Sequence, residues 1–192
     1  MHQTCAKTRI NHIAVGGNVE TSHGSPAKTI AAALNGLARK EIRITRTSRF
    51  YDTPAFPAGS GPNFVNAVVE VSTSLSEDAL LESLHEIEAE FGRLRINRWG
   101  ARTLDLDILS CEGKVVPNVD KWMYWFKLPA QRQLVEIPDR LIVPHPRLQD
   151  RAFVLVPFAE VAPGWRHPVT GLSVTEMLNA LPENLRDEVK PL

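Results

Sequence analysis

Residues 93–109 read Arg93-Leu-Arg-Ile-Asn-Arg-Trp-Gly-Ala-Arg-Thr-Leu-Asp-Leu-Asp-Ile-Leu109. From Thr103 onward polar and apolar residues alternate, and a period of two predicts a β-strand with one face toward a core. Leu104, Leu106 and Ile108 would lie on the buried face, with Asp105 and Asp107 side by side on the other. The ten residues before this strand contain four arginines and no acid. The stretch therefore predicts a strand preceded by a strongly basic loop.

Segments on either side of this stretch alternate between strand-like and helix-like patterns. Ser76 is expected to cap a helix whose apolar stripe ends at Gly92, a typical residue just beyond a helix C-terminus. The other expected elements are strands at 10–15, 42–51 and 64–72, a helix from Ser25 and Pro26 to about Lys40, a loop at 52–63, a hairpin turn at 112–113 leading into 114–116, a short helix or buried turn at 151–161 broken by Pro157, and a capped helix from Ser173 to Pro182. Helices mixed with antiparallel strands predict an α+β fold.

The composition fits a single globular domain over residues 1–192, with residues 1–9 as a flexible N-terminal extension. The chain is 43% hydrophobic and 23% charged, and 22 basic residues balance 22 acidic ones. A net charge of zero argues against a general nucleic-acid or membrane-surface binder, so the basic loop is a local feature. No segment approaches the ~20 apolar residues that cross a bilayer, and Cys5 and Cys111 are too few for a disulfide framework. We therefore expect a cytoplasmic protein with free thiols.

Arginines beside paired carboxylates suit a metal-bound polyphosphate. Arginine binds phosphate oxygens through two parallel N–H groups, and Mg²⁺ is typically held by one or two carboxylates together with substrate phosphates. No Walker A sequence and no kinase glycine-rich loop occur in the chain. Two alternatives remain open. The aspartates could form a solvated acidic face, or the arginines could pair with them in surface ion pairs worth only ~0–1 kcal/mol.

Two further features allow more than one interpretation. His145 stands between two prolines, and Arg147 and Arg151 follow it. This histidine is either a structural turn residue or part of a second cationic wall against a nucleotide. Residues 117–138 contain the run Trp122-Met-Tyr-Trp-Phe126 between prolines. That segment is a surface excursion whose rings pack on the body, a partner surface or an active-site cover.

Several motifs, in order along the chain, resemble those of the 6-hydroxymethyl-7,8-dihydropterin pyrophosphokinase family. They are Val15-Gly-Gly-Asn18, Ser48-x-Phe-Tyr-x-Thr-Pro54, Asn63-Phe-Val-Asn-Ala67, Gly92-Arg-x-Arg95, Arg98-Trp-Gly-x-Arg-Thr-Leu-Asp-Leu-Asp-Ile108, Pro144-His-Pro-Arg147 and Arg151-x-Phe153. The resemblance runs from about residue 10 to residue 176, and its Arg-Trp-Gly-x-Arg-Thr-Leu-Asp-Leu-Asp string is highly specific. The aromatic segment 117–135 is largely additional to the family's pattern.

The resemblance implies a ferredoxin-like α+β fold, with an antiparallel sheet flanked by helices and an aromatic-rich insert near 117–135. It implies transfer of pyrophosphate from ATP to the pterin hydroxymethyl oxygen, with release of AMP, in folate synthesis. Two Mg²⁺ ions would be held by Asp105 and Asp107, and Arg93 and Arg102 would neutralise the phosphates. The implied ATP-binding residues are Glu88, Arg95, Ile108, Arg140, His145 and Arg151. The implied pterin-binding residues are Asn18, Thr53, Pro54, Phe56, Phe64, Asn66, Trp99 and Phe153, with the rings of Phe64 and Phe153 on either side of the pterin.

The expected partners are therefore ATP and the hydroxymethyl-dihydropterin, without nucleic acid or membrane, and the chain is expected to be a monomer or a weak homodimer. A second class of function is a nucleotide or RNA binder that uses the arginine loop without catalysis. It predicts an affinity that falls steeply with salt, but it does not explain why two aspartates adjoin the loop. A third interpretation, an interaction protein built on the aromatic insert, is compatible with catalysis.

Overall fold

The computed structural model describes residues 7–55, 61–93, 102–133 and 135–192. An antiparallel sheet in the order β5-β1-β4-β3-β6, with β2 also paired to β4, forms its centre. Its strands are β1 (Arg9–Gly17), β2 (Arg43–Thr47), β3 (Tyr51–Thr53), β4 (Phe64–Thr73), β5 (Asp105–Cys111) and β6 (Lys190–Pro191). Its helices are α1 (Pro26–Leu37), α2 (Glu77–Glu90), α3 (Val119–Phe126), α4 (Ala130–Gln133), α5 (Ala152–Val161), α6 (Val174–Ala180) and α7 (Glu183–Asp187), with 3-10 turns at Ala38–Lys40 and Leu148–Asp150. The predicted α+β class is confirmed.

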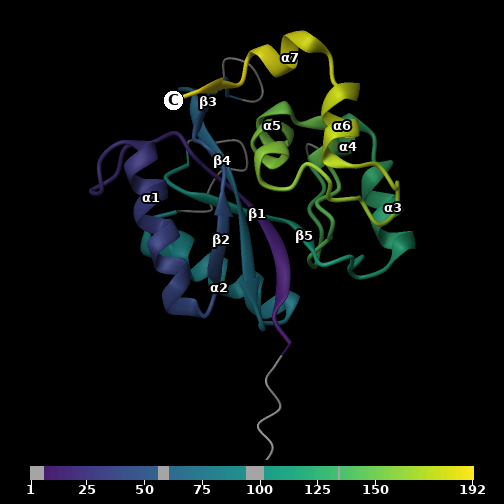
Figure 1. Cartoon of the computed structure of the whole chain (residues 1–192), viewed down its shortest axis with the longest axis horizontal. Helices are drawn as coiled ribbons and strands as arrows, with labels where there is room; N and C mark the ends of the chain where they lie inside the picture. Colours follow the sequence, from purple (N-terminus) through teal and green to yellow (C-terminus); the bar gives the residue numbers. More distant parts are fainter. Residues whose placement is uncertain (1–6, 56–60, 94–101, 134) are drawn as a thin grey trace, which may run out of the picture.

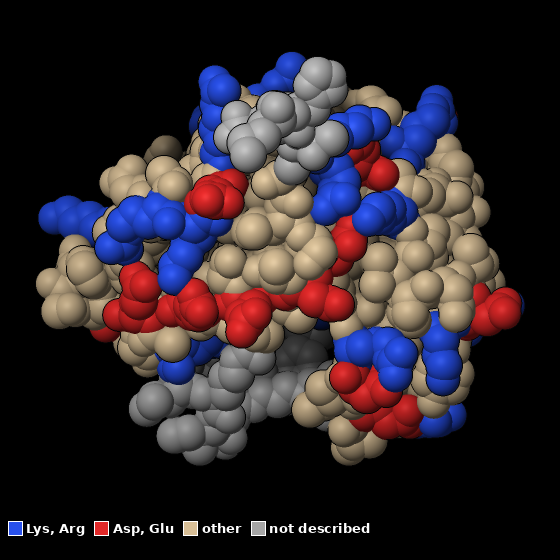
Figure 2. All heavy atoms as spheres, turned by 90° about the horizontal axis from the view of Figure 1, so that it is seen from below, with Lys and Arg blue, Asp and Glu red and all other residues tan. Residues whose placement is uncertain are grey.

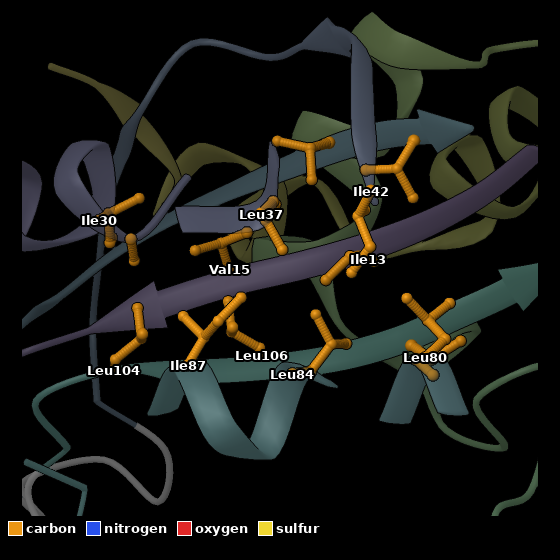
Figure 3. Close-up of a cluster of buried hydrophobic side chains, with 14 of the residues drawn as sticks. Ile13, Val15, Ile30, Leu37, Ile42, Leu80, Leu84, Ile87, Leu104 and Leu106 are labelled. Carbon is orange, nitrogen blue, oxygen red and sulfur yellow. The ribbon is translucent and has the colours of Figure 1, made fainter. Parts of the chain in front are cut away.

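The larger core lies between the sheet and the pair α1 and α2, which cover one of its faces (Figure 1). Ile13 and Val15 of β1 meet Leu84 and Ile87 of α2 there, and Leu106 of β5 joins them (Figure 3). All five side chains are buried. Since residues two apart in a strand share a face, the burial of this face directs the alternate residues of β5 to the opposite side.

The other face of the sheet is covered by α5 and α6 (Figure 1). Val68 of β4 and Phe158 of α5 are fully buried in this second core. Pro157 lies inside α5 and does not break it, contrary to the prediction for this segment. A proline in a helix interior costs ~3 kcal/mol or more. Six of the ten residues of α5 are buried, and this apolar burial compensates that cost.

Helix-end signals are confirmed where side-chain chemistry defines them. Ser76 Oγ accepts a hydrogen bond from the Ala79 N–H, and Gly92 adopts φ +76° just beyond α2. Ser173 and Glu176 form the reciprocal capping box of α6. Ser25 precedes α1 as predicted, although its side chain makes no capping hydrogen bond.

Three strand boundaries differ from the predictions. The segment expected as one strand at 42–51 forms β2 and β3, because the Ser48 hydroxyl accepts from the Val68 N–H and replaces a regular ladder contact. The turn at Gly113 exists, but 114–116 does not run back along β5. Instead, Val116 forms a bridge with Val143. β1 begins at Arg9, whose guanidinium binds the Leu75 carbonyl, so Arg9 is not part of a flexible extension. Residues 1–6, to which the same prediction applies, lie outside the described part of the chain.

The segment 117–135 forms α3 and α4, and α7 and β6 are further elements that the sequence patterns did not indicate. Trp122 of α3 is fully buried, whereas Tyr124 is exposed. Packing on the body is therefore the interpretation that holds for Trp122. Within the described residues, no helix has the length and apolar character needed to cross a membrane.

Three histidines are kept neutral by burial. His12 Nδ1 forms a hydrogen bond of 2.7 Å with Ser110 Oγ. Burial lowers the pKa of His12 to about 4, although the negative charge of Glu70 opposes this shift. Burial also lowers the pKa of His167 to about 4. The pKa of His145 falls to about 3, through burial and then through the positive charges of Arg151 and Arg147.

We predict that the free energy of unfolding falls as the pH drops from about 6.5 toward 4. In this window the unfolded chain protonates His12, His145 and His167 while the folded chain does not, so protons favour the unfolded state. Each histidine should contribute a slope of roughly 1.4 kcal/mol per pH unit. Urea unfolding at pH 7, 6 and 5 measures this slope, and His12→Asn should remove about a third of it. A free energy that is flat over this range would contradict the assignment.

Candidate active site

The two aspartates of β5 lie on the sheet face opposite α1 and α2, as predicted. Asp105 pairs with Gly16 across the β1–β5 ladder, and Asp107 pairs with Ala14. These small neighbours leave room above the carboxylates. Gly16 must also stay small, because a Cβ there would lie 2.5 Å from Asn66 Oδ1. The double glycine of β1, which was expected to end that strand, thus remains in it and lets side chains from β4 come close to the acid pair.

Asp105 is already paired with arginines. Its Oδ1 lies 2.7 Å from Arg93 Nη1, and its Oδ2 accepts a short hydrogen bond from Arg102. The side chain of Asp105 is only 17% exposed, so these are not the weak surface pairs considered as an alternative. Burial and then the charge of Asp107 raise the pKa of Asp105, while the arginines lower it. The arginines therefore compensate a carboxylate that is costly to keep charged.

Glu88 fixes the start of the arginine loop to β5. Its carboxylate is 1% exposed and pairs with the Arg93 guanidinium, and its Oε1 accepts a hydrogen bond of 2.7 Å from the Leu106 N–H. The Arg93 N–H also donates to the Glu88 carbonyl at 3.0 Å. Among the described strands β5 is the edge strand of the sheet, so the N–H of Leu106, between Asp105 and Asp107, has no neighbouring strand on its outer side. The Glu88 carboxylate accepts its hydrogen bond instead. Glu88 was predicted to bind ATP; its observed contacts are with the protein's own loop and strand.

Asn18 joins the two loops that approach the acid pair. Its Oδ1 accepts from the Arg102 N–H at 2.8 Å, and its Nδ2 donates to the Pro62 carbonyl at 3.1 Å. The Asn18 N–H donates to the Arg102 carbonyl as well. The amide of Asn18, which was predicted to bind the pterin, is thus occupied by two backbone segments.

Several predicted pterin residues lie together at one end of β3 and β4. Asn66 Nδ2 donates to Thr53 Oγ1 at 2.7 Å, and Thr53 pairs with Phe64 in the ladder. Asn66 and Phe64 are partly exposed, and Pro54 follows Thr53 at the surface. Phe153 stands in the first turn of α5, with the Arg151 guanidinium 5.7 Å from its ring centre. Phe56 lies outside the described residues.

A β-bulge attaches the His145 segment to the strand of the acid pair. The β1–β5 register shifts between His12 and Ile13, which leaves Leu109 as the extra residue of β5. The Leu109 carbonyl accepts a hydrogen bond of 2.9 Å from the His145 N–H. The alternation of polar and apolar residues ends here, because Leu109 follows Ile108 as a second apolar residue, but this break alone did not indicate a bulge.

The predicted cationic wall is corrected in one respect, because a histidine with a pKa of about 3 is neutral at physiological pH. Arg151 supplies positive charge instead. Burial lowers the pKa of Arg151, and the charges of Asp107 and Asp105 raise it, so its guanidinium acts electrostatically on the acid pair.

For the remaining predicted residues that the structure describes, it gives no side-chain contact with the acid pair. The Ile108 side chain is 4% exposed and belongs to the α1–α2 core, which leaves only its backbone for a ligand. Arg140 is 62% exposed and pairs with Asp139 at 3.2 Å. Arg95, Arg98 and Trp99 lie outside the described residues.

The acid pair fits a hard divalent cation. Asp105 and Asp107 present two carboxylates on one face of β5, and Asp105 Oδ1 is buried there beside the Arg93 guanidinium. In the described part of the chain no group of three or more His, Cys, Asp or Glu side chains is arranged to hold a metal ion. A cation here would rest on two carboxylates and substrate oxygens, which is the usual arrangement for Mg²⁺.

Comparisons with known proteins agree with this geometry. Residues 12–163 match the family model 7,8-dihydro-6-hydroxymethylpterin-pyrophosphokinase (HPPK). The 2-amino-4-hydroxy-6-hydroxymethyldihydropteridine pyrophosphokinase of Pseudomonas aeruginosa is 38% identical over 172 residues, which are 89% of this chain and 91% of that protein. The protein of the same name from Haemophilus influenzae is 32% identical over 181 residues, 94% of this chain and 98% of that protein.

The fold is also similar to a solved structure. The crystal structure of wild-type Plasmodium falciparum HPPK-DHPS with pterin and p-hydroxybenzoate gives a TM-score of 0.68 over 98% of this chain, at 15% identity. This chain spans 47% of the length of that one, and the likeness concerns the fold alone. From the family match and the identity to full-length relatives, the chain belongs to the 7,8-dihydro-6-hydroxymethylpterin-pyrophosphokinase family.

Proposed function

We propose that this chain transfers the pyrophosphoryl group of ATP to the hydroxymethyl oxygen of 6-hydroxymethyl-7,8-dihydropterin and releases AMP, a step of folate synthesis. The observation that carries the proposal is the placement of Asp105 and Asp107 on one face of β5, beside Arg93, Arg102 and Arg151. Transfer between phosphates depends mainly on such positioning and charge compensation. The pyrophosphokinase name of the relatives from P. aeruginosa and H. influenzae supports the same reaction.

Two Mg²⁺ ions are proposed to rest on Asp105 and Asp107. Bound there with ATP, they would neutralise phosphate charge and align the reacting groups. The placement of the two carboxylates side by side on one face of β5 supports this assignment. With cations compensating the carboxylates, Arg93 and Arg102, which now pair with Asp105, would be available to bind phosphate oxygens through paired N–H groups.

The two substrates are proposed to lie on opposite sides of this centre. On the nucleotide side, His145 Nδ1 accepts a hydrogen bond from the Arg147 N–H at 3.2 Å, so the neutral ring carries its proton on Nε2 and can donate it to an acceptor. On the pterin side, Asn66 and Thr53 offer polar atoms, while Phe64 and Phe153 offer rings for stacking. Arg95, Phe56 and Trp99 complete the set as predictions from the sequence.

The RNA-binding alternative is not favoured by the charge distribution. Figure 2 shows acidic side chains lying among basic ones across one face of the molecule, where a nucleic-acid binder would present a continuous basic surface. The acid pair itself would repel a phosphate chain that carries no bound cation. A monomer or a weak homodimer stays the prediction for the oligomeric state.

A product assay tests the reaction directly. With ATP, Mg²⁺ and the hydroxymethyl-dihydropterin, AMP and the pyrophosphorylated pterin should appear in equal amounts by chromatography. Removal of the metal with EDTA should abolish the signal, and added Mg²⁺ should restore it. Formation of ADP, or AMP without a modified pterin, would overturn the proposed reaction.

The acid pair is tested by Asp107→Asn. This nearly isosteric change removes one negative charge from the metal-binding face, and we expect kcat to fall by at least roughly 10²–10³-fold, the range seen when one electrostatic group is lost. Asp187→Asn, an exposed change in α7, is the matched control and should keep full activity. Circular dichroism checks that both variants fold. Wild-type turnover in Asp107→Asn would exclude this residue from the centre.

The buried carboxylate is tested by Glu88→Gln. The amide oxygen still accepts from the Leu106 N–H, but the charge that pairs with Arg93 is lost, which should cost about 3 kcal/mol of folding free energy. Turnover should also fall, because Arg93 is no longer held at the acid pair. The control is Glu90→Gln in the same helix, whose pair with Arg39 is exposed and should contribute less than about 1 kcal/mol. Equal effects of both changes in urea unfolding would refute the special role of Glu88.

A further inference from the structure

α3 is anchored to the body of the protein by rings. Trp122 is fully buried, and it stacks on Phe126 one turn later at 4.8 Å between ring centres and 20° between planes. On another side it contacts the ring of His167, which lies between α5 and α6, at 4.7 Å. Asn118 caps the helix by accepting from the Lys121 N–H. The insert therefore has a fixed position on the α5–α6 side of the molecule (Figure 1).

From this position α3 holds the segment that carries His145. Trp122 Nε1 donates to the Pro144 carbonyl at 2.7 Å, and Pro144 is buried. Arg147 Nη1 donates to the Phe126 carbonyl at 2.8 Å. Phe126 is the last residue of α3, where helix carbonyls lack intrahelical partners and a positive charge is favourable. The two hydrogen bonds thus join α3 to Pro144, immediately before His145, and to Arg147, two residues after it.

The opposite side of the same segment is fixed by β5. The His145 N–H donates to the carbonyl of the bulged Leu109, and β5 also carries Asp105 and Asp107. His145 is therefore held between the strand of the acid pair and the insert. A buried carbonyl that loses its hydrogen-bond donor costs free energy. Loss of the Trp122 indole N–H should therefore make the segment around Pro144 move.

We propose that α3 is a brace for nucleotide binding, in which Trp122 and Arg147 are positioning residues that set the place of His145 relative to the acid pair. This inference rests on the proposed nucleotide role of His145. The function that it assigns to the insert differs from the two alternatives considered above, a partner surface and an active-site cover. Because the brace acts on a binding contact, its loss should raise the KM for ATP and leave kcat within about twofold.

The test uses Trp122→Phe, which keeps an aromatic ring but removes the indole N–H. We expect ATP to bind about 5–10-fold more weakly, the change that corresponds to loss of one hydrogen bond. Trp125→Phe is the matched control. It makes the same chemical change in the same helix, where the Trp125 ring packs edge-on against Tyr124, and it should change ATP affinity less than twofold. Unaltered ATP affinity in Trp122→Phe would overturn the brace.

A double-mutant cycle separates positioning from general destabilisation. In a His145→Ala background, Trp122→Phe should cause less than a twofold further loss of ATP affinity, because the group that it positions is gone. A full additional loss would show that Trp122 does not act through His145. Arg147→Met should weaken ATP binding like Trp122→Phe, and Arg147→Lys, which retains a charged donor, should recover part of the affinity.

Hydrogen exchange keeps the inference independent of the reaction. Amide exchange of residues 143–148, measured by mass spectrometry without nucleotide, should speed up at least fivefold in Trp122→Phe and stay unchanged in Trp125→Phe. Unchanged exchange in Trp122→Phe refutes the brace even if the protein is active. If exchange speeds up but His145→Ala binds ATP normally, His145 does not bind the nucleotide. The proposal that α3 supports nucleotide binding through His145 is then refuted. Absence of AMP formation by the wild-type protein would instead refute the proposed function.

Discussion

A single buried carboxylate, that of Glu88, connects the elements on which the site depends. It accepts from the backbone of β5 between the two aspartates and pairs with Arg93 at the start of the arginine loop. Burying a carboxylate without partners would cost several kcal/mol, so the helix end, the strand edge and the loop must come together for any of them to be stable there. The geometry of the acid pair is thus set by the folding of α2 onto β5 and not by the loop alone.

Among the described residues of the site, arginines compensate the charge of the aspartates. Asp105 is compensated by Arg93 and Arg102, and Arg151 acts on both aspartates. The proposed metal-bound polyphosphate would bring both positive and negative charge, so its cations could replace the arginines at the aspartates while its phosphates took up the arginines. Such a ligand would require acids and arginines together, whereas an anion site would require only the arginines and a metal site only the acids.

The sequence allowed prediction of features that depend on local chemistry. The alternation through Leu104 and Leu106 predicted which face carries the aspartates, and Ser76 predicted the start of α2, because both signals act over a few residues. Glu88 was missed as a structural residue, since a glutamate on an amphipathic helix has no pattern that distinguishes a buried carboxylate from a solvated one. The bulge at Leu109 was missed because it depends on the register of β1. Such features arise from contacts between segments far apart in the chain.

Residues 117–142, which contain α3, form a loop whose two ends meet. Val116 and Val143, which flank this loop, exchange two backbone hydrogen bonds of 2.8 and 3.1 Å, so the chain enters and leaves it at one point. Lengthening a loop whose ends already meet costs little entropy. The core therefore does not have to change to accept α3. α3 contacts the segment that follows Val143, and that segment contains His145. With His145 in its proposed nucleotide role, α3 would lie next to the nucleotide side of the site, and the hydrogen bond from the Trp122 indole to the Pro144 carbonyl would link the two.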